Sequence, residues 1–132
     1  MEPDEETLAF AHRMFELARD GGTEELAANV DAGLPVNLTN HKGDTLLILA
    51  AYHGHPETVA ALLARGADPA RVNDRGQTAL GAATFRRTRD SVVALLAAGA
   101  DPAAGGQSAL AVAQFFDLPE MAELLRGGPA AE

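Results

Sequence analysis

The chain contains the octapeptide Leu62-Leu63-Ala64-Arg65-Gly66-Ala67-Asp68-Pro69, and it returns as Leu95-Leu96-Ala97-Ala98-Gly99-Ala100-Asp101-Pro102. The two copies are 33 residues apart. A period between about 20 and 50 residues is typical of stacked repeats, because one supersecondary unit cannot bury its apolar face alone. The octapeptide therefore predicts a solenoid in which neighbouring units share a core.

Each octapeptide closes a predicted pair of helices. In the first unit, Thr45 is placed to cap a helix over 46–52, Gly54 can end it in the left-handed conformation, and Pro56 suits the first turn of the second helix. Gly66 then ends that second helix. The second unit repeats this plan, with helices predicted over 79–85 and 91–98. The residues proposed to begin or end these helices are Thr78, Ser91 and Gly99.

The flanking units are less regular. Gly106-Gln107-Ser108-Ala109-Leu110 matches Gly76-Gln77-Thr78-Ala79-Leu80 at a spacing of 30, so the third loop is three residues shorter. Ser108 is predicted to begin the helix that follows. Before the first full unit, Thr7 is predicted to cap a helix running to about Arg19, and a short helix is predicted over 23–30.

Composition bounds the class of protein. The 132 residues are 47% apolar but only 5% aromatic, which predicts a soluble, folded protein built from closely packed, alanine-rich helices. There is no cysteine to form disulfides or thiolate metal sites. The longest apolar run, 46–52, is too short to span a bilayer, and the acidic N-terminus does not resemble a secretory signal, so a cytoplasmic location is expected.

The charge is unevenly distributed. The net charge of −9 argues against nucleic acid as a partner. Residues 1–31 carry nine acidic side chains and two arginines, whereas residues 71–89 carry five arginines and one aspartate. A basic segment therefore lies within an acidic protein.

One unit resembles a known family. The run Gly43-Asp44-Thr45-Leu46-Leu47-Ile48-Leu49-Ala50-Ala51-Tyr52-His53-Gly54-His55, followed by Val59, Leu62-Leu63 and Gly66-Ala67-Asp68, is similar to the ankyrin repeat consensus. The resemblance covers roughly residues 10–126 and is to small bacterial ankyrin repeat proteins. It implies an all-α solenoid of helix-turn-helix units, about four repeats including degenerate N- and C-terminal caps. The implied segments are an acidic tail 1–6, a single domain 7–126 (cap 7–37, repeats 38–70 and 71–103, short C-terminal repeat 104–126) and a tail 127–132.

The chain departs from the family pattern at two kinds of position. The Thr-Pro-Leu-His tetrapeptide is replaced by Thr45-Leu46-Leu47-Ile48 and its equivalents, so the hydrogen bonds of that histidine must be missing or replaced. Arg87 stands where the first unit has Gly54. A non-glycine residue in the left-handed conformation is strained by about 1 kcal/mol, so either this turn is rebuilt or Arg87 serves a contact.

Residues with catalytic or metal-binding chemistry are sparse. His53-Gly54-His55 has a His-x-His spacing, but no acidic or thiol companion is evident nearby, and His55 falls on the family's turn histidine. Ser91 and Ser108 are explained by helix capping. We therefore predict no catalytic residues, no metal site and no cofactor.

The predicted binding surface is the concave face, formed in such repeats by loop tips and the exposed side of the first helices. Tyr52, Phe85 and Phe115 occupy the same place in three successive units and form an aromatic row beside arginines, which is the composition of a binding hot spot. The alternative is that Phe115 or Phe116 packs against the last helix and closes the core, and that Arg86, Arg87 and Arg89 form a solvated face. The candidate partner-binding residues are His41, Lys42, Tyr52, His53, Arg75, Phe85, Arg86, Arg87, Phe115 and Phe116.

These observations favour a non-enzymatic protein, expected to be a monomer, that binds another protein through its concave face, with Arg75, Arg86 and Arg87 selecting an acidic segment. The alternative function is an accessory or regulatory subunit that stabilises a partner enzyme or gates access to it. An enzyme in its own right is disfavoured, because no converging polar constellation is evident.

Overall fold

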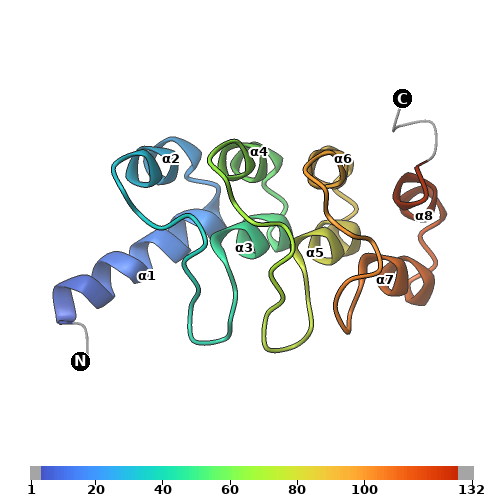
Figure 1. The fold of residues 1–132 in the computed structure, drawn as a ribbon, viewed down its shortest axis with the longest axis horizontal. Coiled ribbons are helices and arrows are strands. Elements are labelled where there is room, and N and C mark those ends of the chain that lie inside the picture. The colour runs from blue at the N-terminus through green and yellow to red at the C-terminus, as the bar shows by residue number, and fades with distance from the viewer. Residues whose placement is uncertain (1–3, 128–132) are drawn as a thin grey trace.

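The computed structural model describes residues 4–127, which form eight helices and no β-strand. Figure 1 shows two layers, with α1, α3, α5 and α7 in one and α2, α4, α6 and α8 in the other. Long loops project from the stack before α3, α5 and α7. The helices are α1 (Glu5–Asp20), α2 (Thr23–Asp31), α3 (Leu46–Tyr52), α4 (Pro56–Ala64), α5 (Ala79–Arg86), α6 (Arg89–Ala97), α7 (Ala109–Phe115) and α8 (Pro119–Leu125). The all-α solenoid is confirmed.

The octapeptide is the end of the second helix in each unit. Helices α4 and α6 stop at Ala64 and Ala97, and the glycine two residues later has a φ of 89° or 94°. This conformation lets Ala67 N donate to Leu62 O, and Ala100 N to Leu95 O, at 3.0 Å in both cases. The aspartate that follows accepts a bond from the backbone two residues on, 2.9 Å long in each copy. The repeated sequence is thus one repeated helix terminator.

Side-chain caps begin the first helix of each repeat as predicted. The hydroxyl oxygens of Thr45, Thr78 and Ser108 each accept a hydrogen bond from the backbone nitrogen three residues later, at 3.0–3.1 Å. Hence α3, α5 and α7 begin at Leu46, Ala79 and Ala109.

Two predicted caps are wrong. Helix α1 begins at Glu5 because Asp4 is its cap and accepts a 2.8 Å bond from Thr7 N, so Thr7 is already in the first turn. Hydrogen bonding to Thr7 also lowers the pKa of Asp4. Helix α6 begins at Arg89, two residues before Ser91. Residues 1–3 of the predicted acidic tail and 128–132 of the predicted C-terminal tail lie outside the described residues.

Ser91 is instead a buried residue, and its hydroxyl has no hydrogen-bond partner within residues 4–127. The equivalent residue one repeat earlier, Thr58, shares a 2.7 Å bond with Thr23 Oγ1. Thr23 is replaced in the next repeat by Pro56, which has no hydroxyl. The absence of this partner explains the unpaired oxygen.

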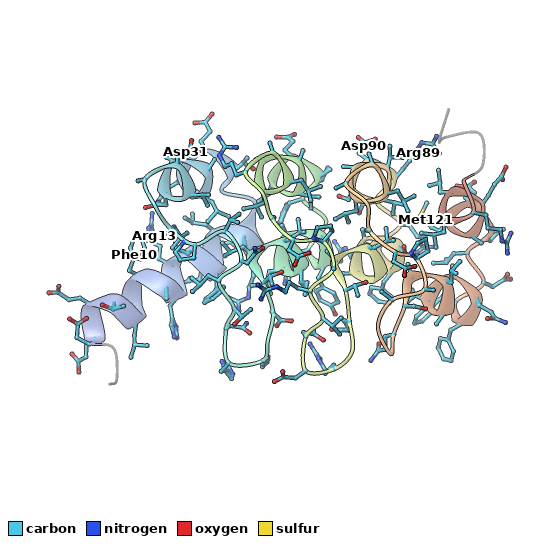
Figure 2. The ribbon with its side chains drawn as sticks, viewed as in Figure 1. Phe10, Arg13, Asp31, Arg89, Asp90 and Met121 are labelled. Carbon is cyan, nitrogen blue, oxygen red and sulfur yellow. The ribbon has the colours of Figure 1, made fainter. Side chains whose placement is uncertain are left out.

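The core runs continuously through the stack. Leu62 and Val59 of α4, and Leu95 and Val92 of α6, are almost fully buried. Each helix packs against its pair and against the equivalent helix of the adjacent repeat. Figure 2 shows apolar side chains such as Met121 of α8 between the layers, whereas Asp31, Arg89 and Asp90 lie on the outside. Neighbouring units therefore share one core, as the period predicts.

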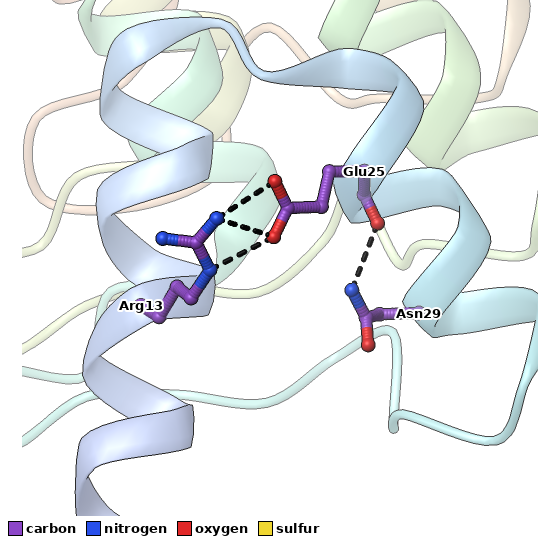
Figure 3. A network of polar contacts seen from close by, with 3 residues as sticks. All are labelled: Arg13, Glu25 and Asn29. Carbon is purple, nitrogen blue, oxygen red and sulfur yellow. Dashed lines mark hydrogen bonds and ion pairs between the residues drawn. The ribbon is translucent and has the colours of Figure 1, made fainter.

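A polar contact joins the first two helices. Arg13 of α1 donates from Nε and Nη2 to both carboxylate oxygens of Glu25 on α2, at 2.8 Å each, and Asn29 Nδ2 donates to the Glu25 backbone oxygen at 2.9 Å (Figure 3). The pair is solvent-exposed, so it stabilises the cap by no more than about 1 kcal/mol.

The loops before α3 and α5 are each held by one asparagine. Asn40 Oδ1 accepts bonds from the backbone of Lys42 and Asp44, and Asn73 Oδ1 accepts bonds from the backbone of Arg75 and Gln77. Asn73 also donates to the buried Asp44 carboxylate of the preceding loop at 2.7 Å.

Backbone bonds join successive loops to one another. Asp74 N donates to Lys42 O at 3.0 Å, and Gln107 N donates to Gly76 O at 2.9 Å. The three loops therefore form one hydrogen-bonded row beside α3, α5 and α7.

Candidate functional site

Tyr52, Phe85 and Phe116 form an aromatic ladder across the first helices of the repeats, α3, α5 and α7, which are here called the inner helices. The rings of Tyr52 (end of α3) and Phe85 (α5) are stacked, with centroids 6.1 Å apart and planes 5° from parallel. Phe116, just after α7, meets Phe85 edge-on with centroids 5.3 Å apart. These side chains are 40%, 42% and 49% exposed, respectively. The ladder is therefore a continuous apolar surface that faces solvent.

The ladder ends on Phe116, although Phe115 is the residue in register with Tyr52 and Phe85. Phe115 is 81% exposed, and its ring contacts Phe116 edge-on at 4.9 Å between centroids. The next position is occupied by Arg86 in α5 and by Phe116 after α7. Arg86 lies against Gly54 and Phe116 lies against Phe85, so both side chains point toward the preceding unit.

A small pocket of about 130 Å³ lies between the ladder and the loops. Gln77 and Gln107 from the loops form one wall, and Gly81 of α5 lies at its base. A Cβ on Gly81 would be 2.9 Å from the Gln107 backbone oxygen, so the short third loop leaves no room for a side chain at this position. The remaining wall is formed by Tyr52, Ala82, Phe85, Val112 and Phe116.

An open depression of about 520 Å³ lies on the other side of the ladder. Arg86 and Arg87 line it, and neither forms an ion pair with any residue in the described 4–127 segment. The other lining residues are Gly54, Phe85, Thr88, Phe116 and Leu118. Unpaired guanidinium groups beside exposed rings can bind carboxylates without first breaking an internal salt bridge.

The structure brings seven of the ten predicted site residues together. Tyr52, Phe85, Arg86, Arg87 and Phe116 line the two cavities, and His53 and Phe115 contact the rings of Tyr52 and Phe116. His41, Lys42 and Arg75 are exposed in the loops and line neither cavity. Thr88 and Leu118 also line the larger depression and were not predicted; their positions correspond to His55 in the first repeat.

The two histidines have different environments. His55 Nε2 lies 2.6 Å from the Arg19 backbone oxygen, so its ring joins the first repeat to the end of α1. His53 packs edge-on against Tyr52, and partial burial, followed by the charge of Arg19, lowers its pKa. Both effects favour the uncharged form of His53. No group of three metal-ligating side chains converges within residues 4–127.

A family model for ankyrin repeats, in three copies, matches residues 14–105. The chain belongs to the ankyrin repeat family. Ankyrin repeats are generally protein–protein interaction modules and are typically non-enzymatic. Within the described residues, this ankyrin repeat protein has no helix with the length and apolar character needed to cross a membrane.

This ankyrin repeat protein is also similar to a Pseudomonas aeruginosa protein named as an ankyrin repeat protein. The two are 54% identical over 57 residues, which is 43% of this chain and 33% of that protein. The match thus spans about a third of the length of the relative, and it supports the repeat assignment.

The ankyrin turn after α5 carries backbone strain. Arg87 has φ 58°, the left-handed conformation that Gly54 adopts one repeat earlier and that Asp117 adopts one repeat later, with φ 53°. Arg87 N still donates to Thr84 O at 3.0 Å, so the turn is not rebuilt. Arginine is therefore held in a conformation that favours glycine, next to the larger depression.

Replacing Arg87 with glycine is expected to raise the free energy of unfolding by about 0.5–1 kcal/mol. Glycine removes the left-handed strain, although its greater freedom in the unfolded chain offsets part of the gain. Urea denaturation monitored by circular dichroism measures the change. Gly54→Ala, at the same position one repeat earlier, should have the opposite effect. A loss of stability in Arg87→Gly would instead show that the arginine side chain stabilises the fold.

Proposed function

We propose that this ankyrin repeat protein binds another protein, without catalysis, through the concave surface between its loops and inner helices. The observation that supports this proposal is the aromatic ladder. Its three rings contact one another in succession, yet each remains 40–49% exposed to solvent. Exposed, contiguous aromatic side chains beside a pocket are typical anchors of protein interfaces.

The charges beside the ladder favour an acidic segment in the partner. Arg86 and Arg87 lack ion pairs within residues 4–127, in a chain whose net charge is −9. A guanidinium can bind a carboxylate through two parallel hydrogen bonds. The ladder, with the pocket and the depression on either side of it, is here called the concave groove. Arg75 and Lys42 add positive charge on the loops and are suited to steering the partner toward this groove. The proposed place of action is the cytoplasm.

The double substitution Tyr52→Ala and Phe85→Ala is expected to abolish partner capture and to leave the melting temperature nearly unchanged. Tyr52 and Phe85 are 40% and 42% exposed and stack on one another at the surface, so truncating them removes apolar binding area without opening an enclosed cavity in the core. The immobilised protein is exposed to extract from its native source, bound proteins are identified by mass spectrometry, and the purified binder is titrated by calorimetry. Thermal unfolding of the free variant is measured in parallel.

Val93→Ala is the matched control, because Val93 is an exposed apolar residue on α6 in the outer layer. It should retain the binder at wild-type affinity. Equal capture by the wild type and the double variant would contradict the proposal. A large loss of stability in the double variant would show that the ladder acts as core. Recovery of an enzyme at one-to-one stoichiometry would assign the accessory role that the sequence leaves as an alternative.

A further inference from the structure

The N-terminal half of α1 extends beyond the repeat stack. Gly21 after α1 and Gly54 after α3 are equivalent turn residues one period apart, and both have positive φ. In this register the first residue of α3, Leu46, corresponds to Arg13, so residues 5–12 have no counterpart in the shorter α3. Figure 1 shows this part of α1 projecting from the end of the molecule.

The projecting part combines exposed apolar and acidic side chains. Leu8 and Phe10 are 47% and 45% exposed, and Figure 2 shows Phe10 on the projecting part of α1. Asp4, Glu5 and Glu6 lie within one or two turns of them and form no ion pair among the described residues. Residues 4–12, which are the Asp4 cap and the projecting part of α1, are here called the acidic overhang. They form an acidic segment with an exposed aromatic ring.

The acidic overhang has the chemistry that the concave groove lacks. The groove presents exposed rings and unpaired arginines, whereas the overhang presents a ring, an aliphatic side chain and unpaired carboxylates. The sizes also match, because residues 5–12 form two turns of helix about 12 Å long. The ladder extends over two consecutive centroid separations of 6.1 and 5.3 Å.

We propose that the acidic overhang of one copy docks in the concave groove of a second copy. Phe10 contacts the Phe85 and Phe116 rings. Glu6, one turn before Phe10 on the same face of α1, pairs with Arg86 or Arg87, and Glu5 adds negative charge beside it. This inference rests on the proposed function, since the same groove binds the ligand. One molecule cannot make the contact alone, because the C-terminal half of its α1 is packed against α2 and α3.

The contact is head-to-tail. Each copy then retains one free overhang and one free groove, so association is open-ended and depends on concentration. The net charge of −9 on each copy opposes association at long range. At an ionic strength of about 0.15 M the Debye length is about 8 Å, which screens this repulsion more than it screens ion pairs in contact. In place of the monomer expected from the sequence, the protein self-associates weakly.

The test uses two charge-reversed variants of the whole chain in sedimentation equilibrium. Wild-type protein should show a mass that rises with concentration. Glu5→Lys with Glu6→Lys, and Arg86→Glu with Arg87→Glu, should each remain monomeric, because like charges then meet and association is weakened at least about tenfold. An equimolar mixture of the two variants should associate again and show a mass that rises with concentration. The acidic overhang meets a basic groove in one contact and the basic overhang meets an acidic groove in the other, so the two variants alternate along the assembly.

Glu24→Lys with Glu57→Lys is the matched control for Glu5→Lys with Glu6→Lys, since it makes the same change in net charge on exposed residues of α2 and α4. It should associate at least as strongly as the wild type. A wild type that stays monomeric up to roughly millimolar concentration, or a mixture that forms no complex, would overturn the inference. Two combinations of results separate the two proposals. If the wild type stays monomeric but captures a protein that the Tyr52→Ala, Phe85→Ala variant does not capture, only the self-association is contradicted. If the mixture of charge-reversed variants associates but the wild type captures no protein from the extract, only the proposed function is contradicted.

Discussion

Replacement of Leu95 by alanine is expected to lower the free energy of unfolding by about 3 kcal/mol, within the range of about 2–5 kcal/mol typical of buried leucines. Leu95 is fully buried in α6, which packs against α4, α5 and α8, so the cavity is enclosed by helices of three repeats. A loss of this size is a large part of a typical total stability of about 5–15 kcal/mol. Urea denaturation at equilibrium measures it, and the melting temperature should fall by roughly 10 °C.

Val93→Ala on the same helix separates packing from helix propensity, because Val93 is exposed and alanine is the better helix former. Its effect should lie within about 0.5 kcal/mol of zero. If Leu95→Ala cost less than about 1 kcal/mol, the helices around it would not share the close-packed core described above.

Replacement of Asn73 by alanine is expected to cost about 2–3 kcal/mol, although the residue is polar and lies in a loop. Its Oδ1 accepts two backbone hydrogen bonds, and its Nδ2 donates to Gln77 Oε1 at 2.9 Å and to Asp44 Oδ1 at 2.7 Å. Alanine removes all of these bonds and leaves the buried Asp44 carboxylate with a single 3.4 Å contact from Asn40. Burial of a charged group without partners accounts for most of the cost.

Asn40→Ala provides the comparison, because Asn40 holds its own loop in the same way but donates to no other loop. Its cost should be about 1 kcal/mol. Denaturation of both variants tests the difference, and amide hydrogen exchange should show faster exchange at Asp74 N, which bonds to the neighbouring loop, only in Asn73→Ala. Equal losses of stability would mean that the link between the loops contributes little.

Most of the fold could be predicted because its determinants are local and recur every 33 residues. Thr45, Thr78 and Ser108 each stand directly before an apolar helix, and capping needs only a hydroxyl at that point. The predicted starts of α1 and α6 were wrong because, in both, more than one nearby residue could begin the helix. Both Asp4 and Thr7 can cap α1, and the sequence does not show that Thr7 N is the donor to Asp4. Ser91 resembles a cap, but the helix already begins at Arg89.

The candidate site could be predicted less completely. The recurrence of an aromatic residue at Tyr52 and Phe85 indicated a row, and their exposure answers whether they lie in the core. The choice between Phe115 and Phe116 depends on which side chain points toward the preceding repeat, and sequence spacing does not contain that direction. The unpaired state of Arg86 and Arg87 likewise depends on which acids lie within reach. Those distances are set by how the repeats pack against one another and not by the local sequence around the two arginines.

The packing between adjacent repeats also determines how the chain folds. The main contacts of each helix are with its own pair or with the equivalent helix of the next repeat, so contacting residues are separated by little more than one repeat in the sequence. Closing short loops costs little entropy, and proteins dominated by such contacts fold rapidly. Folding can therefore start in any pair of adjacent units and extend in both directions. The two central repeats, which have a neighbour on each side, are the favoured nucleus, and the ladder is completed only when α7 docks on α5.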